Sequence, residues 1–574
     1  MSDFNEIKTP DMHEPWDGES LPAGARAGLW AVLGIALGVA LPYVIAPILP
    51  FDEPTEPTAA RSDGEEAEVH FGEELKRTIG LMRAWLPGDR VPFANLFEPK
   101  KHAAEDGAVG PSATSVAAIA GVGSDGDPDV AAMPALVIDK AAAPTEPKVG
   151  EPGKTPEPGT TPEPGKTPEP GKAPELGKAP SPTAAIHIPP ASYEGLTTFI
   201  EDPSGALAPF YAKLAEVALQ TPDAVVRISH YGDSAIAADG MPSAARRLLQ
   251  RTFGDGGHGF SLVAASNHWY RRKDIVWDSS GWDTNVYISD DAKDGRYGFA
   301  GTIATGFQGA KASWRTVEGP DGTVGTKASR FQVYFQAGPG GGRIAVNVDG
   351  VEQQVIDTAS DTKEDRVVVV EVPDAPHTFE LKNAGGGKTR LYGAAIERHA
   401  GVVYDGLGTI GARDTRWQNM DKEAAIAAIR QRGTDLGVFM YGGNQLEDKI
   451  SMDRYRESLT PVVKLWREAL AGKGCLLMSS IDHGERYRGR VRTVPRLVDI
   501  MRVQREVALA EGCAWFSLYD AMGGNGVIGE WFEQGLAEGD LAHPTSKGAI
   551  ILGQLFYKAL MKGFADWLAA GGAK

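Results

Sequence analysis

The 574-residue sequence predicts a three-layer α/β fold with a parallel sheet, interrupted by an antiparallel β-sandwich and preceded by a membrane anchor and a linker. Three observations predict it. Helix-like and strand-like segments alternate from about residue 190 to the end, which is typical of a parallel sheet covered on both faces. Between residues 284 and 399 this pattern gives way to short alternating runs separated by Gly, Asp and Pro, which favour antiparallel strands. A long uncharged segment and a proline-rich repeat precede both regions.

Composition bounds the class of protein. Hydrophobic residues make up 42% of the chain, which is enough for a substantial core, and the formal net charge of -18 argues against a nucleic-acid partner. The chain has two cysteines, Cys475 and Cys513, which give neither a disulfide framework nor metal-ligand spacing. Each begins an apolar run, so a buried thiol pair on neighbouring strands is favoured over a disulfide.

Residues 28–49 carry no charge and are long enough to cross a bilayer as a helix. An uncleaved anchor is favoured over a cleaved signal peptide, because no clear small-residue cleavage site follows the segment. Lys8 and Arg26 precede it, and the next basic residue is Arg61. This asymmetry predicts a single-pass protein with a cytoplasmic tail at 1–27 and an extracytoplasmic, periplasmic remainder.

The next expected region, residues 50–189, combines a juxtamembrane segment with a disordered linker. Residues 151–180 repeat EPGKTP, EPGTTP, EPGKTP, EPGKAP and ELGKAP with a six-residue period. Regularly spaced proline excludes helix and favours an extended, polyproline-like spacer. A proline-motif docking peptide is the alternative.

The α/β domain is expected in two parts, 190–283 and 400–574, on either side of the insert at 284–399. At least four parallel strands are predicted, each followed by a helix. The strands are expected within 223–230, 434–443, 473–482 and 513–524, and the helices within 205–219, 242–253, 421–433, 452–470, 496–512 and 547–569.

Four polar motifs stand out, three where a predicted strand or the insert ends and the fourth just before the last predicted helix. Ser234 follows the strand at 223–230, GLGTIGAR occupies 406–413, YGGNQ occupies 441–445 and DLAHP occupies 540–544. Because loops at the carboxyl ends of parallel strands meet at one crevice, we expect these motifs to lie together.

The last motif can supply a base. An Asp three residues before a His can accept the proton-bearing ring nitrogen and leave the other nitrogen free. Asp540 is therefore expected to orient His543, and His543 to deprotonate Ser234. The alternative is structural: Ser234 as a helix N-cap, with Asp540 and His543 as a cap and a surface histidine.

Acyl transfer also needs donors for an oxyanion. The candidates are the side-chain amide of Asn444 and the backbone N–H groups of Gly411 and Ser234. Gly408 is an alternative to Gly411 in the same loop, and Asn444 in a Gly-Gly-Asn turn can be plain turn chemistry.

These four blocks, in this order, resemble the SGNH (GDSL-type) hydrolase superfamily of esterases and acyltransferases. HYGDS, the insert, VVYDGLGTIGA and AMGGNG are most similar to its extracytoplasmic branch of peptidoglycan and polysaccharide O-acetylesterases and O-acetyltransferases. The resemblance covers about residues 195–570 and implies a flavodoxin-like parallel sheet, with an insert that resembles a carbohydrate-binding module.

The resemblance also assigns roles. It implies Ser234 as nucleophile, His543 as base and Asp540 as its orienting partner, with Ser234, Gly411 and Asn444 as oxyanion donors. Gln445 departs from the family pattern, in which Asp or a similar residue usually follows this Asn. No metal or organic cofactor is expected.

Other notable side chains are expected to be structural. Packing or solvation is favoured over substrate contact for the remaining histidines near the motifs, His230, His258 and His483. Core packing is favoured over sugar stacking for the tryptophans Trp417, Trp515 and Trp531. The glycines of AMGGNG, 521–526, form either a flexible lip or a plain loop.

The sequence therefore predicts a serine esterase that removes O-acyl groups, O-acetyl in the first place, from a cell-envelope glycan such as peptidoglycan. One alternative is an O-acetyltransferase that modifies a polysaccharide and receives acyl groups from a membrane partner. A second is a non-catalytic glycan-binding envelope protein.

Overall fold

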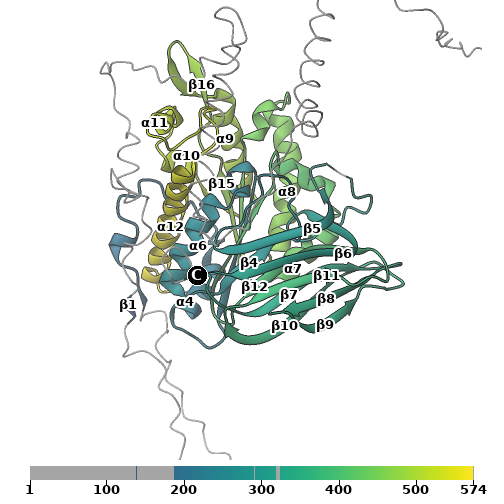
Figure 1. The fold of residues 1–574 in the computed structure, drawn as a ribbon. Helices are drawn as coiled ribbons and strands as arrows, with labels where there is room; N and C mark the ends of the chain where they lie inside the picture. Colours follow the sequence, from purple (N-terminus) through teal and green to yellow (C-terminus); the bar gives the residue numbers. More distant parts are fainter. Residues whose placement is uncertain (1–136, 139–185, 290, 318–323, 573–574) are drawn as a thin grey trace, which may run out of the picture. The chain divides into compact units, whose positions relative to one another are not determined.

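The computed structural model describes residues 137–138, 186–289, 291–317 and 324–572 (Figure 1). The predicted anchor at 28–49 and the repeat at 151–180 lie outside these ranges. Within them, no helix combines the length and apolar character that a bilayer span requires.

A parallel sheet of five strands forms the centre of the α/β part. Its strands are β3 (Val225–Gly232), β13 (Gly401–Gly408), β14 (Leu436–Tyr441), β15 (Gly474–Ser479) and β18 (Ala514–Phe516), in the spatial order β13-β3-β14-β15-β18. Numbered along the chain, this is the flavodoxin-like order 2-1-3-4-5. Four of these strands were predicted; β13 was recognised from the sequence only as a motif-bearing junction.

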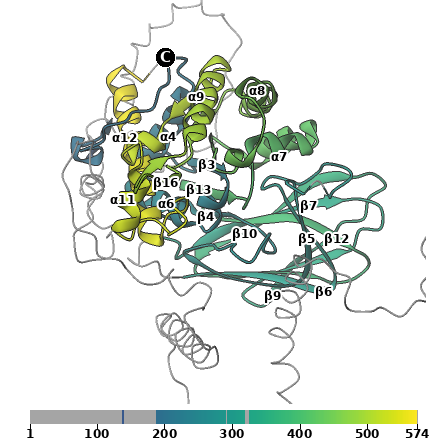
Figure 2. The ribbon, with the colours of Figure 1, turned by 90° about the horizontal axis from the view of Figure 1, so that it is seen from above.

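Helices cover both faces of this sheet, as the alternation in sequence predicts (Figure 2). On one face lie α4 (Ala208–Ala218), α6 (Gly240–Phe253) and α12 (Ser546–Ala569), and on the other α7 (Lys422–Arg432), α8 (Met452–Ala469) and α9 (Pro495–Ala510). The side chains of strand β14 alternate between these two faces. Val438 and Met440 pack against the helices α4, α6 and α12, whereas Phe439 and Tyr441 pack against α7, α8 and α9. Both faces are buried, so the strand reads as a continuous apolar run.

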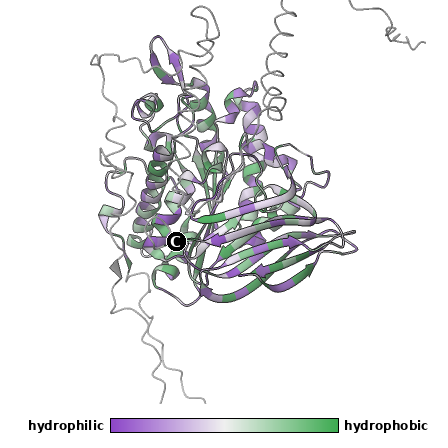
Figure 3. Ribbon diagram, in the orientation of Figure 1, coloured by the Kyte–Doolittle hydropathy of each residue, from purple (hydrophilic) through white to green (hydrophobic). Residues whose placement is uncertain are grey.

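The insert is an antiparallel sheet of nine strands. Its strands are β4 (Gly257–Ser261), β5 (Ile275–Val286), β6 (Thr302–Thr316), β7 (Ala328–Ala337), β8 (Arg343–Val348), β9 (Val351–Asp357), β10 (Glu364–Ala375), β11 (Thr378–Asn383) and β12 (Thr389–Glu397). The central path runs β10-β7-β12-β6-β11-β8-β9, with β4 on β12 and β5 on β6. In Figure 3 these strands carry both hydrophobic and hydrophilic residues along their lengths, as expected for strands with one buried face.

Antiparallel pairing begins earlier than residue 284, where the insert was expected to start. Strands β4 and β5 already belong to the antiparallel sheet. The sequence of β5, IVWDSSGWDTNV, hides this strand, because Asp, Asn and Gly are depleted in strands and most of its side chains lie at least partly exposed.

The favoured thiol pair was wrong: Cys475 and Cys513 form a disulfide, with Cα atoms 4.9 Å apart. Cys475 lies on β15, and Cys513 immediately precedes the adjacent strand β18. Three shorter elements were not predicted either: the antiparallel pair β16 (Gly484–Tyr487) and β17 (Arg490–Thr493), and helix α11 (Val527–Glu533).

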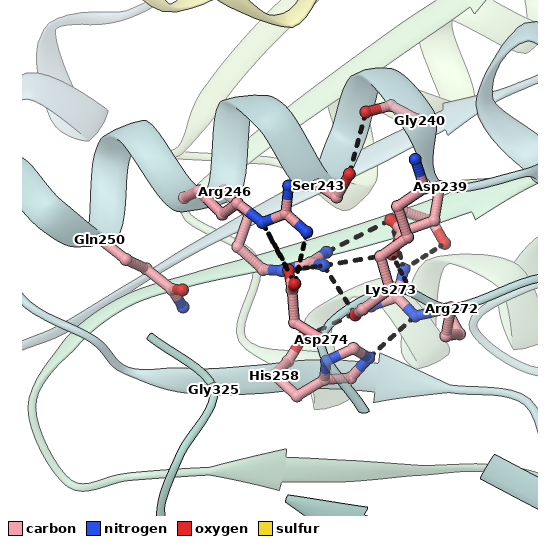
Figure 4. Close-up of polar contacts among 12 residues, drawn as sticks. Asp239, Gly240, Ser243, Arg246, Gln250, His258, Arg272, Lys273, Asp274 and Gly325 are labelled. Carbon is pink, nitrogen blue, oxygen red and sulfur yellow. Dashed lines mark hydrogen bonds and ion pairs between the residues drawn. The ribbon is translucent and has the colours of Figure 1, made fainter. Parts of the chain in front are cut away.

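A buried cluster of charges fixes α6 to the segment between β4 and β5 of the insert (Figure 4). Arg246 is 1% exposed and bonds the carboxylates of Asp239 and Asp274 at 3.0–3.2 Å. Arg272 reaches Asp239 at 3.1 Å, and its Nε donates to His258 Nε2 at 3.0 Å. Burial and the charge of Arg272 hold the pKa of His258 well below its ordinary value, so the ring is a neutral acceptor.

A second cluster joins the insert to the α/β part. Arg432 of α7 donates to both oxygens of Asp405 on β13, at 2.8 and 2.9 Å, and forms an ion pair with Glu397 at the end of β12. Arg227 of β3 also bonds Glu397, at 2.7 Å. Both sheets therefore share one buried, charge-neutral contact.

Removing Arg246 should destabilise the protein strongly. Arg246→Met keeps the side-chain length but leaves two buried carboxylates short of a partner, which we expect to cost about 3 kcal/mol of unfolding free energy. Urea unfolding measures it. Arg454→Met, which removes the exposed pair with Glu457, is the control and should cost less than about 1 kcal/mol. Equal losses would contradict the importance of the buried cluster.

Candidate active site

Ser234 lies at a sharp turn between β3 and the short helix α5 (Ser234–Ala237). Asp233 caps this helix by accepting the N–H of Ala235 at 3.1 Å. The turn needs glycine at 232, since a Cβ there would lie 2.5 Å from the Ile236 side chain and 2.9 Å from the Met440 carbonyl. The Gly-Asp-Ser sequence thus builds the turn, and Ser234 remains partly exposed at its apex.

The three residues expected to form the triad lie in hydrogen-bonding contact. Ser234 Oγ is 2.8 Å from His543 Nε2, and His543 Nδ1 is 2.7 Å from Asp540 Oδ2. Because an ionised carboxylate only accepts, the second bond places the ring proton on Nδ1 and leaves Nε2 as an acceptor for the serine hydroxyl.

The DLAHP loop is organised around its own carboxylate. Asp540 Oδ1 accepts the N–H groups of Ala542 and His543 at 2.9 and 3.1 Å. Burial alone would raise the pKa of Asp540, but these bonds and the one from the His543 ring outweigh it and lower the pKa. The loop then enters α12, which Thr545 caps by accepting the N–H of Gly548 at 3.3 Å.

The site is open to solvent. The side chains of Asp540 and His543 are 51% and 44% exposed. Solvent therefore reaches the Asp540–His543 pair directly.

Asn444 connects three of the four motifs. Its Nδ2 donates to the carbonyl of Ala412 at 3.0 Å and lies 3.5 Å from Asp233 Oδ2. Ala412 directly follows Gly411, whose φ of +76° is a backbone conformation that favours glycine. Asn444 and Gly411 thus lie close to the Ser234 turn, as predicted.

Gly408, the alternative donor, has a packing role. A Cβ at this position would lie 2.2 Å from the backbone nitrogen of Ala237 in α5, so only glycine permits this contact. Nothing lies within 4 Å of a Cβ built on Gly411. The structure therefore distinguishes the two glycines of this loop: one allows close packing and the other faces open space.

A buried carboxylate behind this loop was missed. Asp414 accepts Tyr455 Oη at 2.5 Å and Gln504 Nε2 at 3.0 Å, and burial raises its pKa despite these bonds. Gln445, the departure from the family pattern, is also buried, with 1% of its surface exposed. The only sequence feature that pointed to Asp414 was its place directly after GLGTIGAR.

The other histidines and the tryptophans are structural, as expected. His230 Nδ1 contacts Tyr404 Oη at 2.7 Å, and burial lowers the pKa of His230 to about 3. His483 lies nearer the site, 3.3 Å from Ser480 Oγ, and burial and the charge of His543 lower its pKa to about 4. All three candidate tryptophans are in the hydrophobic core: Trp417, Trp515 and Trp531.

The AMGGNG segment is tied down at one end. Asn525 Oδ1 accepts the N–H of Thr493, and the N–H of Gly526 donates to Thr493 Oγ1 at 2.9 Å. Through these bonds the loop holds the base of the β16–β17 hairpin. Across the described ranges, no three His, Cys, Asp or Glu side chains are grouped in a way that could hold a metal ion.

Asp233 should make stability depend on pH. Burial raises its pKa to about 6, against the Ala235 N–H bond and the charge of His543, whereas an unfolded Asp has a pKa of about 3.9. Between these values the folded protein holds a proton that the unfolded chain releases, so unfolding free energy falls as pH rises, by up to about 3 kcal/mol.

Asp233→Asn keeps an acceptor for Ala235 but cannot ionise. The unfolding free energy of the Asp233→Asn variant, measured in urea and compared with that of wild type, should therefore increase from pH 4 to pH 8. The comparison at pH 4 is the internal control, because Asp233 is protonated there in the folded protein. A difference that stays constant with pH would contradict this assignment.

Comparisons with known proteins agree with this architecture. No family model and no curated protein matches the chain. A solved peptidoglycan O-acetylesterase is similar at 21% identity with a TM-score of 0.55, covering 64% of this chain and 99% of the esterase. A family two carbohydrate esterase from Cellvibrio japonicus is 12% identical over 51% of this chain and 98% of its own, and a lipase/acylhydrolase from Enterococcus faecalis is 19% identical over 28% and 77%. Both have a TM-score of 0.22. The chain therefore shares its fold with the peptidoglycan O-acetylesterase structure, in agreement with the SGNH-type resemblance of its four motifs.

Proposed function

We propose that the protein is a serine esterase of the SGNH type that removes O-acyl groups, O-acetyl in the first place, from a cell-envelope glycan. The observation that carries the proposal is the continuous set of bonds from Ser234 Oγ through His543 to Asp540, at 2.8 and 2.7 Å. A serine hydroxyl bonded to an oriented, neutral imidazole is the arrangement that nucleophilic acyl transfer requires.

The reaction proceeds in two halves. As Ser234 Oγ attacks the ester carbonyl carbon, its proton passes to His543 Nε2, and the imidazolium that forms is stabilised by Asp540. The tetrahedral intermediate collapses, the sugar oxygen leaves with the proton from Nε2, and the acyl group stays on Ser234. Water, deprotonated by His543, then attacks the acyl-enzyme; the bond from the acyl carbon to Ser234 Oγ breaks, Nε2 returns the proton to Oγ, and the free acid leaves.

Three donors surround the position where the oxyanion forms. The N–H of Ser234, as the first residue of α5, has no acceptor within its own helix, and the N–H of Gly411 belongs to the adjacent loop. Asn444 Nδ2 carries two protons, one held by the Ala412 carbonyl. The other is directed toward Asp233 Oδ2 at 3.5 Å, beyond the length of a strong hydrogen bond, so it remains available to an oxyanion beside the Ser234 turn.

A glycan substrate is supported by the motif resemblance, by the fold shared with a peptidoglycan O-acetylesterase and by the open site. The disulfide between Cys475 and Cys513 suits an oxidising compartment outside the cytoplasm. We propose that residues 28–49 anchor the enzyme in the membrane and that the linker carries the catalytic part into the periplasm.

Ser234→Ala should abolish esterase activity. Loss of the nucleophile is expected to lower kcat on p-nitrophenyl acetate, and acetate release from O-acetylated peptidoglycan, by at least about 10³-fold. Ser458→Ala, at a half-buried position on α8, is the matched control and should behave as wild type. Activity that survives in Ser234→Ala would support a glycan-binding protein without catalysis. Acetyl transfer to a sugar in preference to water would identify a transferase.

Asp540→Asn tests the orienting role separately. The amide can still accept the two backbone N–H groups, but its NH₂ would face His543 Nδ1 and favour the tautomer with the proton on Nε2. We expect kcat to fall about 10³- to 10⁴-fold with unchanged thermal stability. Asp566→Asn, an exposed carboxylate on α12, is the control. A loss below tenfold would exclude this role for Asp540.

A further inference from the structure

The β16–β17 hairpin concentrates positive charge in an acidic protein. Its sequence, GERYRGRVRT, has four arginines and one glutamate, whereas the chain as a whole has a formal net charge of -18. Figure 1 shows the hairpin standing out from the helices around it.

Three of the four arginines of the hairpin are exposed to solvent. Arg492 is engaged with Glu485, with 2.7 Å between its Nε and a carboxylate oxygen, and lies over the Tyr487 ring. The remaining three arginines are exposed, and none of them is ion-paired with a residue that the structure describes: Arg486, Arg488 and Arg490.

The tip of the hairpin places an arginine where turn chemistry does not favour one. Arg488 and Gly489 have φ values of +50° and +80°, a two-residue turn whose positions normally select Asn, Asp or Gly. The guanidinium of Arg488 lies 5.1 Å from the centre of the Tyr487 ring. The charge at the tip is therefore present at a conformational cost.

One strand end of the hairpin is hydrogen-bonded to the loop that holds His543. The N–H of Gly484 donates to the Leu541 carbonyl at 2.8 Å, and Leu541 directly follows Asp540 in DLAHP. Thr493, at the other end, donates to Asp482 Oδ1 at 2.7 Å. The hairpin is thus a fixed extension of the active-site rim.

We propose that this hairpin binds anionic groups, carboxylates in the first place, on the same glycan chain whose acyl ester is bound at Ser234. The inference rests on the proposed function. Guanidinium groups pair with carboxylates through two parallel hydrogen bonds. A protein of net negative charge repels an anionic polymer at long range, so local positive charge beside the site is needed to hold one there.

The variant Arg486→Gln/Arg490→Gln tests the proposal. It removes two exposed charges and leaves the Arg492–Glu485 pair and the turn residues in place. Arg430→Gln/Arg454→Gln removes the same charge from α7 and α8 and is the matched control. Binding is measured by co-sedimentation of the full chain with peptidoglycan from which O-acetyl groups have been removed, so no turnover is involved.

We expect the hairpin variant to bind about three- to tenfold more weakly than wild type at low salt, the control to bind as wild type, and the difference to shrink at high salt. On O-acetylated peptidoglycan, the hairpin variant should show a higher KM with little change in kcat. On acetylated xylan, a neutral polymer, it should match the control.

Equal peptidoglycan binding by the two double variants would overturn the proposal. So would a selective loss of binding to phosphatidylglycerol vesicles with peptidoglycan binding intact, which would make the hairpin a membrane contact. These outcomes are distinct from failure of the proposed function, which would appear as a wild-type protein inactive on every ester while the binding difference persists.

Discussion

The hydrogen bond between Ser234 Oγ and His543 Nε2 joins two segments 309 positions apart in the chain, and the candidate site depends on it. The parallel sheet makes this contact available. Ser234 follows β3 and Asn444 follows β14, neighbouring strands at the place where the strand order reverses. Loops diverge there and leave room at the carboxyl ends of the strands. Short packing distances at Gly232 and Gly408 then fix the loops, so the position of the hydroxyl follows from the backbone.

Two buried clusters of charged side chains also hold the structure around the site. Arg246 with Asp239 and Asp274, and Arg432 with Asp405 and Glu397, hold the segments that lead into and out of the insert. Such groups are costly to bury and gain little net stability when paired, but each tolerates few alternative arrangements. Their location at the two crossings between the sheets suits a role in fixing the insert against the α/β part.

Much of the site could be predicted because local sequence determines it. The Asp540–His543 spacing, the Gly-Asp-Ser turn and the Asn after two glycines each specify their geometry over a few residues. The order of motifs along alternating strands and helices then places them at one edge. The central helices were predicted for the same reason, since their apolar periodicity is local.

What sequence missed depends on distant partners. β13 became a strand through pairing with β3, and β5 through pairing with β6, in spite of its polar residues. The disulfide was missed although the two cysteines were expected on neighbouring strands, because adjacency in a sheet does not decide whether two thiols are oxidised. Asp414 is recognisable as a buried acid only when Tyr455 and Gln504, from two later helices, are seen to surround it.

The register Glu397 opposite Gly257 has a further consequence for how the chain was assembled. Because the first and last strands of the insert are antiparallel neighbours, the chain leaves the α/β part and returns to it at almost the same point. The insert, roughly a quarter of the chain, therefore connects two points of the α/β part that a short surface loop could also connect. A module attached in this way can be gained, exchanged or lost without redirecting any strand of the parallel sheet. Its loss would uncover the apolar layer that it shares with the α/β part, where Phe299 packs against Tyr231, and would remove the pairing of Arg432 and Arg227 with Glu397.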